Sequence, residues 1–243
     1  MKYISFLFPI HNEVNRVHHV IKFIDFLEDS PTLNSKYELV FLLNDCSDGT
    51  KDRLAEILRG KSFSTIEVAS RSRGAGVNEA IRTLKTELCA ICAIDSSWGY
   101  EFYENSFQLF SSDSNLDIVY GPKNHSASKV KKSVLRKIIS AASYLYINAL
   151  FPRTFEHETQ CIKMFRRNLR MCGLLHDYNY FSETEFYILG RRTAAKTASI
   201  PVNVTEKKGS KVSLGKIMEF CYEALKFRFF LLRNKQRIEK YQT

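Results

Sequence analysis

The stretch LCAICAIDSS, residues 88–97, is an apolar run that ends abruptly on one acidic residue, Asp95. A short apolar run that ends in turn residues is typical of a buried strand. Similar runs, rich in β-branched and aromatic residues, cover residues 3–10, 37–43, 63–69 and 116–121. We predict a strand in each of these runs, the quoted one included, over residues 88–94.

Segments with the apolar spacing of helices separate these runs. We therefore predict helices over residues 14–27, 50–58, 74–84 and 101–110. Strands that alternate with helices form right-handed crossovers, which give a mainly parallel sheet flanked by helices on both faces. The expected fold class is α/β and Rossmann-like.

The chain divides by its pattern into two parts. Residues 1–212 are expected to form one globular domain, and residues 213–243 a basic amphipathic C-terminal helix. The chain has 243 residues, of which 44% are hydrophobic, so it is long enough to bury one large core.

The balance of charges indicates the kind of partner. The chain has 36 Lys and Arg residues against 26 Asp and Glu residues, a net charge of +10. This charge favours an anionic partner, such as a nucleotide or a phospholipid surface. Nucleic acid is the least expected partner, because the basic residues form no recognised nucleic-acid-binding motif.

The six cysteines are scattered along the chain, and no secretory signal precedes them. This usage predicts reduced thiols in a cytoplasmic setting. Cys89 and Cys92 form a CxxC, but they lie inside an apolar strand without a second pair of Cys or His nearby. A zinc site is therefore not expected there.

Ligand-capable residues follow the first four strands, at the edge where open α/β sheets bind their ligands. Ordinary turn chemistry explains Asp48, a suitable cap for the next helix. It explains less well the acids Asp45 and Asp95 at strand exits, and Arg73 before two glycines, where backbone amides would receive a phosphate. We predict that Asp45, Arg73 and Asp95 share one nucleotide-binding crevice.

Eight motifs occur in a fixed order over residues 3–215: FPIHNE, LLNDCSDGT, RSRGAGVNEAIR, AIDSS, DIVYGPK, CIKMFRRN, SETEFYILGRR and IPVNVTEKKGSKVS. In this order the set resembles the inverting glycosyltransferases of the GT-A fold, family 2 type. It is most similar to the dolichyl- and polyprenyl-phosphate mannose or glucose synthases. Such enzymes move a sugar from a nucleotide donor to a polyprenyl phosphate at a membrane.

The resemblance implies roles for individual residues. The implied nucleotide-sugar-binding residues are Pro9, Asn12, Glu13, Asp45, Arg73, Gly74 and Asp95. The implied acceptor-phosphate-binding residues are Lys123, Arg136 and Ser140, and the implied catalytic residues are Asp95, Arg136 and Glu185. The basic stretch EKKGSKVS, residues 206–213, resembles a loop that closes over donor phosphates, although a mobile surface loop explains it equally well.

Asp95 would be the first acid of a DxD metal motif, but Ser97 occupies the position of the second acid. Mg²⁺ or Mn²⁺ takes about six oxygen ligands, and a nucleoside diphosphate and water supply several of them. We therefore expect a weakly held metal at Asp95, with a hydroxyl contribution from Ser97. The rival hypothesis is a metal-free site assisted by Arg71 or Arg73.

The acceptor decides whether the site needs a general base. A hydroxyl acceptor requires one, near Glu158, Glu183 or Glu185, whereas a phosphate monoester with a second pKa of about 6 is already largely dianionic. Ser182 and Glu185 also have the S-x-x-E spacing of a helix-capping box, which needs no catalysis. The alternatives to a polyprenyl phosphate acceptor are a saccharide hydroxyl in surface polysaccharide synthesis and a catalytically silent GT-A binding protein.

The C-terminal helix is expected to have one apolar side and many cations on the other. The apolar side comprises Ile217, Phe220, Cys221, Ala224, Leu225, Phe227, Phe230 and Leu231. Such a helix can lie in the headgroup layer, and the uncharged run at residues 138–152 would add a second apolar surface. We expect a peripheral protein on the cytoplasmic face of the membrane. The alternative is that this side packs on the catalytic domain or on a second subunit of a homodimer.

Overall fold

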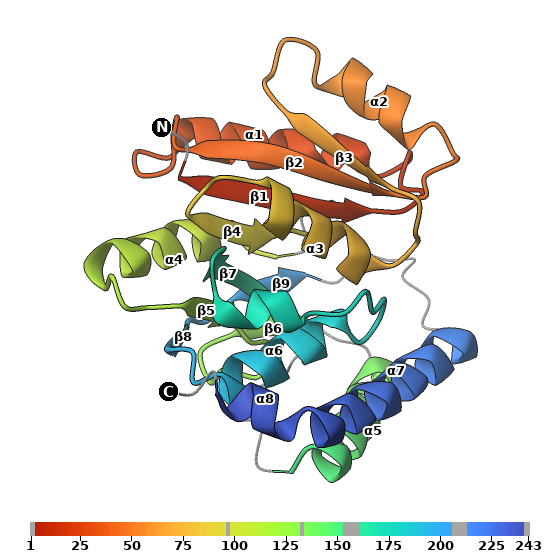
Figure 1. Ribbon diagram of the computed structural model, residues 1–243. Coiled ribbons are helices and arrows are strands. Elements are labelled where there is room, and N and C mark those ends of the chain that lie inside the picture. The colour runs from red at the N-terminus through yellow and green to blue at the C-terminus, as the bar shows by residue number, and fades with distance from the viewer. Residues whose placement is uncertain (1–2, 96–97, 132–133, 153–160, 206–212, 241–243) are drawn as a thin grey trace.

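The computed structural model describes residues 3–95, 98–131, 134–152, 161–205 and 213–240, and it has helices on both faces of one large sheet (Figure 1). Within these residues the large sheet has seven strands, in the order β3-β2-β1-β4-β7-β5-β8. Its strands are β1 (Ile4–Ile10), β2 (Tyr37–Asn44), β3 (Ser64–Val68), β4 (Leu88–Ile91), β5 (Ile118–Gly121), β7 (Ile162–Arg166) and β8 (Thr197–Ser199). A second, two-stranded sheet pairs β6 (Lys129–Lys131) with β9 (Asn203–Thr205).

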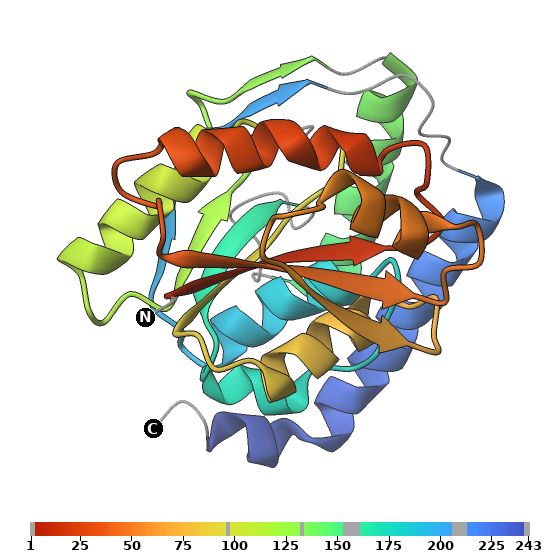
Figure 2. The same ribbon diagram turned by 90° about the horizontal axis from the view of Figure 1, so that it is seen from above.

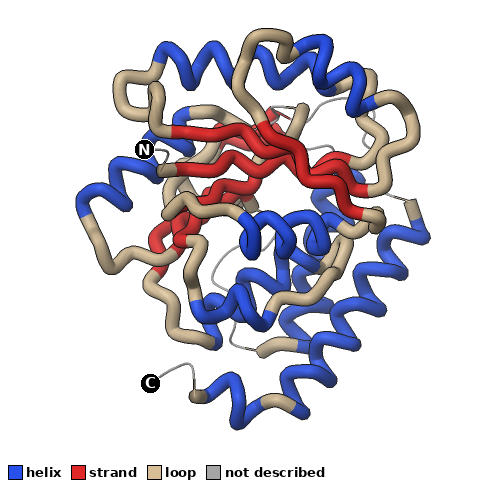
Figure 3. The backbone as a smooth tube through the Cα atoms, turned by 45° about the horizontal axis from the view of Figure 1, so that its top comes forward, coloured by secondary structure: helices blue, strands red, loops and turns tan. Residues whose placement is uncertain are grey.

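The helices connect these strands and cover the sheet, as Figure 3 shows by colour. They are α1 (Val20–Asp29), α2 (Thr50–Ile57), α3 (Arg73–Thr83), α4 (Glu101–Ser112), α5 (Val134–Leu150), α6 (Ser182–Arg192), α7 (Leu214–Arg233) and α8 (Lys235–Glu239). Two short 3₁₀ helices, η1 (Val17–His19) and η2 (Arg170–Leu174), precede α1 and α6.

The sheet is mainly parallel, as the alternation of strands and helices predicts. Strand β1 lies parallel to β2 and β4, and β2 lies parallel to β3. Strand β7 is the exception, because it runs antiparallel between β4 and β5. Its first residues therefore lie at the carboxyl edge of its neighbours, where Lys163 pairs with Ile91 and Tyr120.

Alternating residues of the strands separate two hydrophobic cores, one on each face of the sheet. In β1, Phe6 and Phe8 face the core that includes α1, α2 and α4, whereas Leu7 faces the other core. The second core includes side chains of α3, α5, α6, α7 and α8. The two faces give the layered arrangement that Figure 2 shows from above.

The five strands and four helices predicted from the sequence are confirmed, with small shifts at their ends. The predicted helix at residues 14–27 begins instead as η1 and continues as α1 to Asp29. The apolar-run criterion did not reveal β7, because its short sequence IKMFR contains two cations. One of these cations, Lys163, is completely buried in the folded chain.

The predicted C-terminal helix is two helices, α7 and α8, with a break at Asn234. Five of the eight residues of the apolar side expected from the sequence belong to the second core, since Ala224, Phe227 and Leu231 are buried there and Phe220 and Phe230 pack against it, whereas Leu225 is exposed. The alternative prediction, that this side packs on the catalytic domain, is therefore correct for these residues. Within the described part of the chain, no helix is both long and apolar enough to span a bilayer.

Candidate functional site

The loops after β1 and β2 are joined to each other by hydrogen bonds at the carboxyl edge of the sheet. The ring nitrogen Nδ1 of His11 lies 2.7 Å from the Asn44 carbonyl oxygen, and the Ser47 amide donates to Asn12 Oδ1 at 2.8 Å. Asn12 and Asp45 have positive φ angles of 52° and 47°. Asn and Asp tolerate this left-handed backbone better than most residues.

Asp95 and Glu13 lie on either side of one cation, Arg16. The guanidinium of Arg16 lies 2.9 Å from a Glu13 oxygen and 3.7 Å from a carboxylate oxygen of Asp95. Burial raises the pKa of Glu13, Arg16 lowers it, and the neighbouring Asp95 raises it further. The first strand end and the fourth therefore share one charged cluster, in which Arg16 was not predicted from the sequence.

The other nucleotide-binding candidates of these two strands lie nearby. Pro9 is half-buried in β1 and pairs with Leu42 of β2. Beside them, at the end of β2, Asp45 accepts a 3.0 Å hydrogen bond from Arg71, and both side chains are exposed. Arg71, one of the two cations of the metal-free hypothesis, thus contacts Asp45.

Arg73 is the first residue of α3, and the helix start is held against the loop before α6. Ser72 caps the helix, because its hydroxyl accepts from the Ala75 amide at 3.3 Å. The Gly74 amide donates to the Tyr178 carbonyl at 2.9 Å, and a Cβ on Gly74 would lie only 2.5 Å from that oxygen. The amide of Gly74 is therefore engaged within the protein, and close packing explains this glycine without a phosphate contact.

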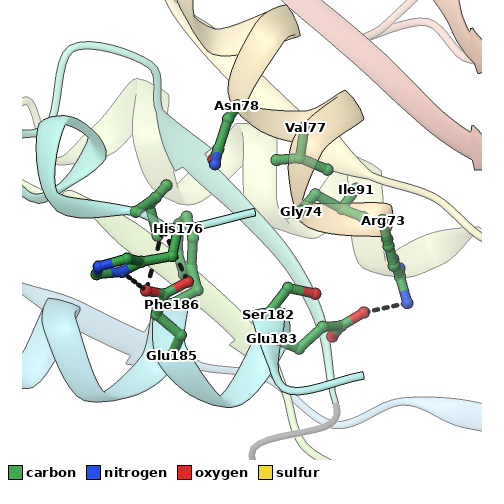
Figure 4. A pocket seen from close by; sticks show the side chains of 11 residues that line it. Arg73, Gly74, Val77, Asn78, Ile91, His176, Ser182, Glu183, Glu185 and Phe186 are labelled. Atoms are coloured by element: carbon green, nitrogen blue, oxygen red, sulfur yellow. Dashed lines mark hydrogen bonds and ion pairs between the residues drawn. The ribbon is translucent and has the colours of Figure 1, made fainter. Parts of the chain in front are cut away.

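Glu183, the second residue of α6, joins two cations (Figure 4 shows the first). Its carboxylate lies 2.5 Å from Arg73 Nη1 and 2.7 Å from Lys163 Nζ. Burial alone would raise the pKa of Glu183, but Arg73, Lys163 and Lys123 outweigh this effect and lower it. Glu183 is therefore an ionised counter-ion, surrounded by an excess of positive charge.

Lys123, an acceptor-phosphate candidate, follows β5 and belongs to this cationic cluster. Its ammonium lies 4.7 Å from the centre of the Trp98 ring, and its charge contributes to the lowered pKa of Glu183. Ser140 is half-buried on α5. The side chain of Arg136, residue Ser97 and most of the stretch EKKGSKVS lie outside the part of the molecule that the structure describes.

A cavity beneath the start of α3 separates the two acids of α6. It is a small, partly open cavity of about 20 Å³, and its lining includes Arg73, Gly74, His176, Glu183 and Glu185. Asp45 and Asp95 lie outside this lining, so they do not share this cavity with Arg73.

Glu185 points away from Arg73, toward the loop that contains His176 (Figure 4). Two residues along a helix turn about 200°, so Glu183 and Glu185 face opposite ways. Glu185 is 1% exposed, and its Oε1 lies 2.5 Å from His176 Nδ1. Burial raises its pKa to about 7, against the lowering effect of the His176 hydrogen bonds. Of the two acids, the structure places Glu183 beside the donor candidate Arg73.

The capping box predicted from Ser182 and Glu185 is wrong. Phe181 is the N-cap of α6 and has no side-chain cap, and the Ser182 hydroxyl donates to the Asn179 carbonyl at 3.0 Å. The amides of the N-cap Phe181 and of the two residues before it donate to Glu223 of α7. A local sequence pattern cannot reveal a hydrogen-bond partner that lies more than 40 residues away.

Protein metal sites usually bring several His, Cys, Asp or Glu side chains together. Among the described residues, no group of three or more such side chains is placed to hold a metal ion. The oxygen ligands available at the strand exit come from Asp95, with Glu13 beside it. Two acids next to one arginine can take part in a divalent site only together with ligand oxygens, as expected for a metal that arrives with a nucleoside diphosphate.

Comparisons with known proteins support the fold assignment. No protein family model matches the chain. The dolichyl-phosphate beta-glucosyltransferase ALG5A of Trichomonas vaginalis is 22% identical over 245 residues, which cover 94% of this chain and 73% of that protein.

Solved structures give the same picture. Glucosyl-3-phosphoglycerate synthase of Mycobacterium tuberculosis, in complex with Mn²⁺, UDP and phosphoglyceric acid, aligns with a TM-score of 0.64 at 15% identity, over 93% of this chain and 78% of that one. The same enzyme with Mn²⁺, UDP-glucose and phosphoglyceric acid gives a TM-score of 0.65 at 15% identity, over 93% and 79%. The chain therefore has the GT-A glycosyltransferase fold that its ordered sequence motifs imply, and its similarity to a dolichyl-phosphate beta-glucosyltransferase extends along almost its whole length.

Proposed function

We propose that the chain is an inverting glycosyltransferase that moves a hexose from a nucleoside-diphosphate sugar to a polyprenyl phosphate. The observation that carries this proposal is the cluster of Arg73, Lys123 and Lys163 around the single carboxylate of Glu183. An excess of cations at the carboxyl edge of a GT-A sheet suits a reaction in which both the leaving group and the acceptor are phosphates.

The two described acids of α6 are poorly suited to act as a general base. Glu183 forms ion pairs with two cations, and its lowered pKa makes it a weak base. Glu185 has a pKa of about 7, but it is enclosed and bound to His176. A hydroxyl acceptor needs a base, whereas a phosphate acceptor is already anionic near neutral pH. The third candidate base, Glu158, lies outside the described residues.

In this proposal, the loops after β1 and β2 hold the nucleotide. Asn12, Glu13 and Asp45 border the base and ribose, and Arg73 faces the donor phosphates. Lys123, Arg136 and Ser140 receive the acceptor phosphate. The carboxylate of Glu185 is enclosed, so in this proposal Glu185 positions the site through His176. Glu183 balances the charge of the surrounding cations.

A divalent cation, Mg²⁺ or Mn²⁺, would be held by Asp95 together with the donor diphosphate, with Ser97 as a further candidate ligand. When bound, it would neutralise charge on the departing diphosphate. Arg16 lies 3.7 Å from Asp95, so a cation must compete with a resident positive charge, and this supports a weak site. The structural neighbours bound to Mn²⁺ and UDP support a divalent metal of this kind.

The proposal places the protein on the cytoplasmic face of a membrane, and two exposed apolar stripes support docking on a lipid surface. The stripe on α7 comprises Leu214, Met218, Tyr222, Leu225, Phe229 and Leu232, each between 43% and 72% exposed. The spacings of four, four, three, four and three residues place all six on one side of the helix. This stripe lies opposite the buried residues Ala224, Phe227 and Leu231, and it shares only Leu225 with the apolar side predicted from the sequence.

The stripe on α5 is uncharged and consists of Ile138, Ala141, Ala142, Leu145 and Ala149, all exposed. Helices α5 and α7 lie side by side, as Figures 1 and 2 both show. The Tyr146 hydroxyl donates to the Cys221 carbonyl at 3.0 Å. Tyr146 is a helical neighbour of Ala142 and Ala149, so the contact lies along the edge of the α5 stripe.

Cys221 is in turn a helical neighbour of Met218 and Leu225 in the α7 stripe. The two stripes therefore meet along one seam. Exposed cations beside them, among them Lys216, Lys226 and Arg233, complement an anionic leaflet. A second copy of the chain would cover the apolar residues but would bring these cations together, so a lipid surface is the favoured partner.

The test is a transfer assay with UDP- and GDP-sugars, each with and without undecaprenyl phosphate in anionic vesicles. We expect a lipid-linked sugar that forms only when donor and acceptor are both present. Transfer to an added saccharide instead would overturn the choice of acceptor. Donor binding without turnover under every condition would identify a silent GT-A protein.

A further inference from the structure

The start of α6 is held by a side chain from the C-terminal helix. Glu223 of α7 accepts hydrogen bonds from the amides of Asn179, Tyr180 and Phe181, at 2.7, 3.1 and 2.9 Å. Glu223 is only 8% exposed. The first amides of a helix need partners, and a carboxylate there also interacts favourably with the helix dipole. Glu223 thus holds the segment that leads into α6 and satisfies the amide of its N-cap residue, Phe181.

The same loop, residues 176–181, also holds the start of α3. The Ser72 hydroxyl donates to the Asp177 carbonyl at 2.6 Å, and the Gly74 amide donates to the Tyr178 carbonyl at 2.9 Å. These contacts lie on both sides of Arg73 in the sequence. One short loop therefore connects α7 with the helix start that positions Arg73.

The two ends of this connection meet again at Glu183. Glu183 lies two residues after the last amide that Glu223 holds, and its carboxylate lies 2.5 Å from Arg73. A displacement of α7 would therefore act on the Arg73–Glu183 pair by two routes. One route is the backbone of α6, and the other is the loop that holds α3.

Glu223 and the exposed stripe lie on opposite sides of α7. Nine residues separate Leu214 from Glu223, and nine residues of an α-helix make about two and a half turns. Leu214, at the start of the stripe, is 72% exposed, whereas Glu223 is buried. One rigid helix thus presents a lipid-compatible side outward and a site-positioning carboxylate inward.

We propose that Glu223 is a positioning residue that transmits the docking of α7 on a lipid surface to Arg73 and Glu183. The inference rests on the proposed function, because it takes the membrane as the partner of the α7 stripe. Docking fixes α7, α7 fixes the three amides before α6, and these fix the pair of charges at the donor phosphates. Transfer is therefore faster on a vesicle than with the same reactants in solution.

The test compares the full-length chain with the variants Glu223→Gln and Glu239→Gln. Glu239 is an exposed acid on α8 that pairs with Lys235 at 3.9 Å, and it serves as the matched control. Each protein is assayed with a donor sugar and a water-soluble short-chain prenyl phosphate, with and without anionic vesicles, and also with a polyprenyl phosphate in the same vesicles. Vesicle binding is measured separately by flotation.

We expect Glu223→Gln to lower kcat on vesicles about tenfold, or about 1.4 kcal/mol in the barrier, while the KM for the donor changes little. Vesicle binding should be unchanged, and the control should behave as the wild type. A conservative Glu223→Asp variant should recover part of the loss. Equal vesicle stimulation in Glu223→Gln and wild type would overturn the proposal, and so would a loss of vesicle binding.

Hydrogen exchange gives a second measurement that does not depend on turnover. Addition of vesicles without substrate should increase the protection of amides 179–185 in the wild type but not in Glu223→Gln. If the wild type makes no lipid-linked product, the proposed function fails, and the exchange result still tests the connection itself. Unchanged protection in the wild type would refute it.

Discussion

The Lys163–Glu183 ion pair allows a quantitative prediction, because one partner is completely buried. The side chain of Lys163 is 0% exposed, that of Glu183 is 11% exposed, and their charged atoms lie 2.7 Å apart. Removal of one partner from a buried pair leaves an uncompensated charge, which typically costs about 3–5 kcal/mol. We therefore expect Glu183→Gln to destabilise the protein by about 3 kcal/mol, since the amide oxygen still accepts a hydrogen bond.

The double variant separates this charge effect from packing. Lys163→Met keeps the stem of the side chain but removes the charge, and Glu183 retains Arg73 as a partner. In Glu183→Gln/Lys163→Met no buried ammonium is left without a counter-ion. The double variant should therefore be no less stable than Glu183→Gln alone, with a coupling free energy of about 2–3 kcal/mol between the two positions.

The assay is urea unfolding of the four proteins in the cycle, with the slope checked for constancy. The Lys51–Glu67 pair provides the matched control, because its atoms are 2.5 Å apart but its side chains are 58% and 61% exposed. The same cycle at Lys51 and Glu67 should give no measurable coupling. Equal coupling in the two pairs would refute the reasoning that burial, and not distance, sets the strength of the pair.

Three further predictions concern single residues. Burial raises the pKa of Glu185 from 4.5 to about 7, so the folded state binds this proton more tightly than the unfolded chain. The contribution of Glu185 to the free energy of unfolding is therefore complete below about pH 4.5 and falls by about 3 kcal/mol as the pH rises through 7. Glu185→Gln should flatten this dependence of stability on pH, measured by urea unfolding. Gly74→Ala should lower stability in thermal melts by about 1–3 kcal/mol, because its Cβ would lie 2.5 Å from the Tyr178 carbonyl oxygen. The control Gly173→Ala, whose Cβ would have no atom within 4 Å, should show no such loss of stability. Asp95→Asn should bind the donor equally with and without EDTA in calorimetry, while the wild type should bind more weakly with EDTA, and equal binding by the wild type would refute the metal hypothesis.

Much of the sheet was predictable because its strands are apolar runs that follow one another along the chain. The same periodicity places Asn12, Asp45 and Asp95 at strand exits, and the structure confirms this for Asn12 and Asp45. Strand β4 ends earlier than predicted, at Ile91, so Asp95 lies in a turn four residues beyond it. Strand β7 was not predictable by this route, since its buried Lys163 looks like a surface residue until Glu183 is placed beside it.

The choice between the two acids of α6 also depended on tertiary contacts. Glu183 and Glu185 have similar sequence surroundings, and only the positions of Arg73 and His176 distinguish them. Likewise, Arg16 becomes a site residue only when β1 and β4 bring Glu13 and Asp95 together. Local patterns predict elements and their ends, whereas pairs that are distant in sequence require the fold.

A helix that is apolar on two opposite sides affects how the protein behaves once it is purified. Contiguous apolar surface on an isolated soluble protein promotes self-association, and the outer side of α7 is such a surface. In detergent-free buffer we therefore expect weak, concentration-dependent oligomers that dissociate when mild detergent is added. In a dimer formed under those conditions, the second copy would cover the apolar surface in place of lipid, and the dimer interface would be the face that normally contacts the bilayer.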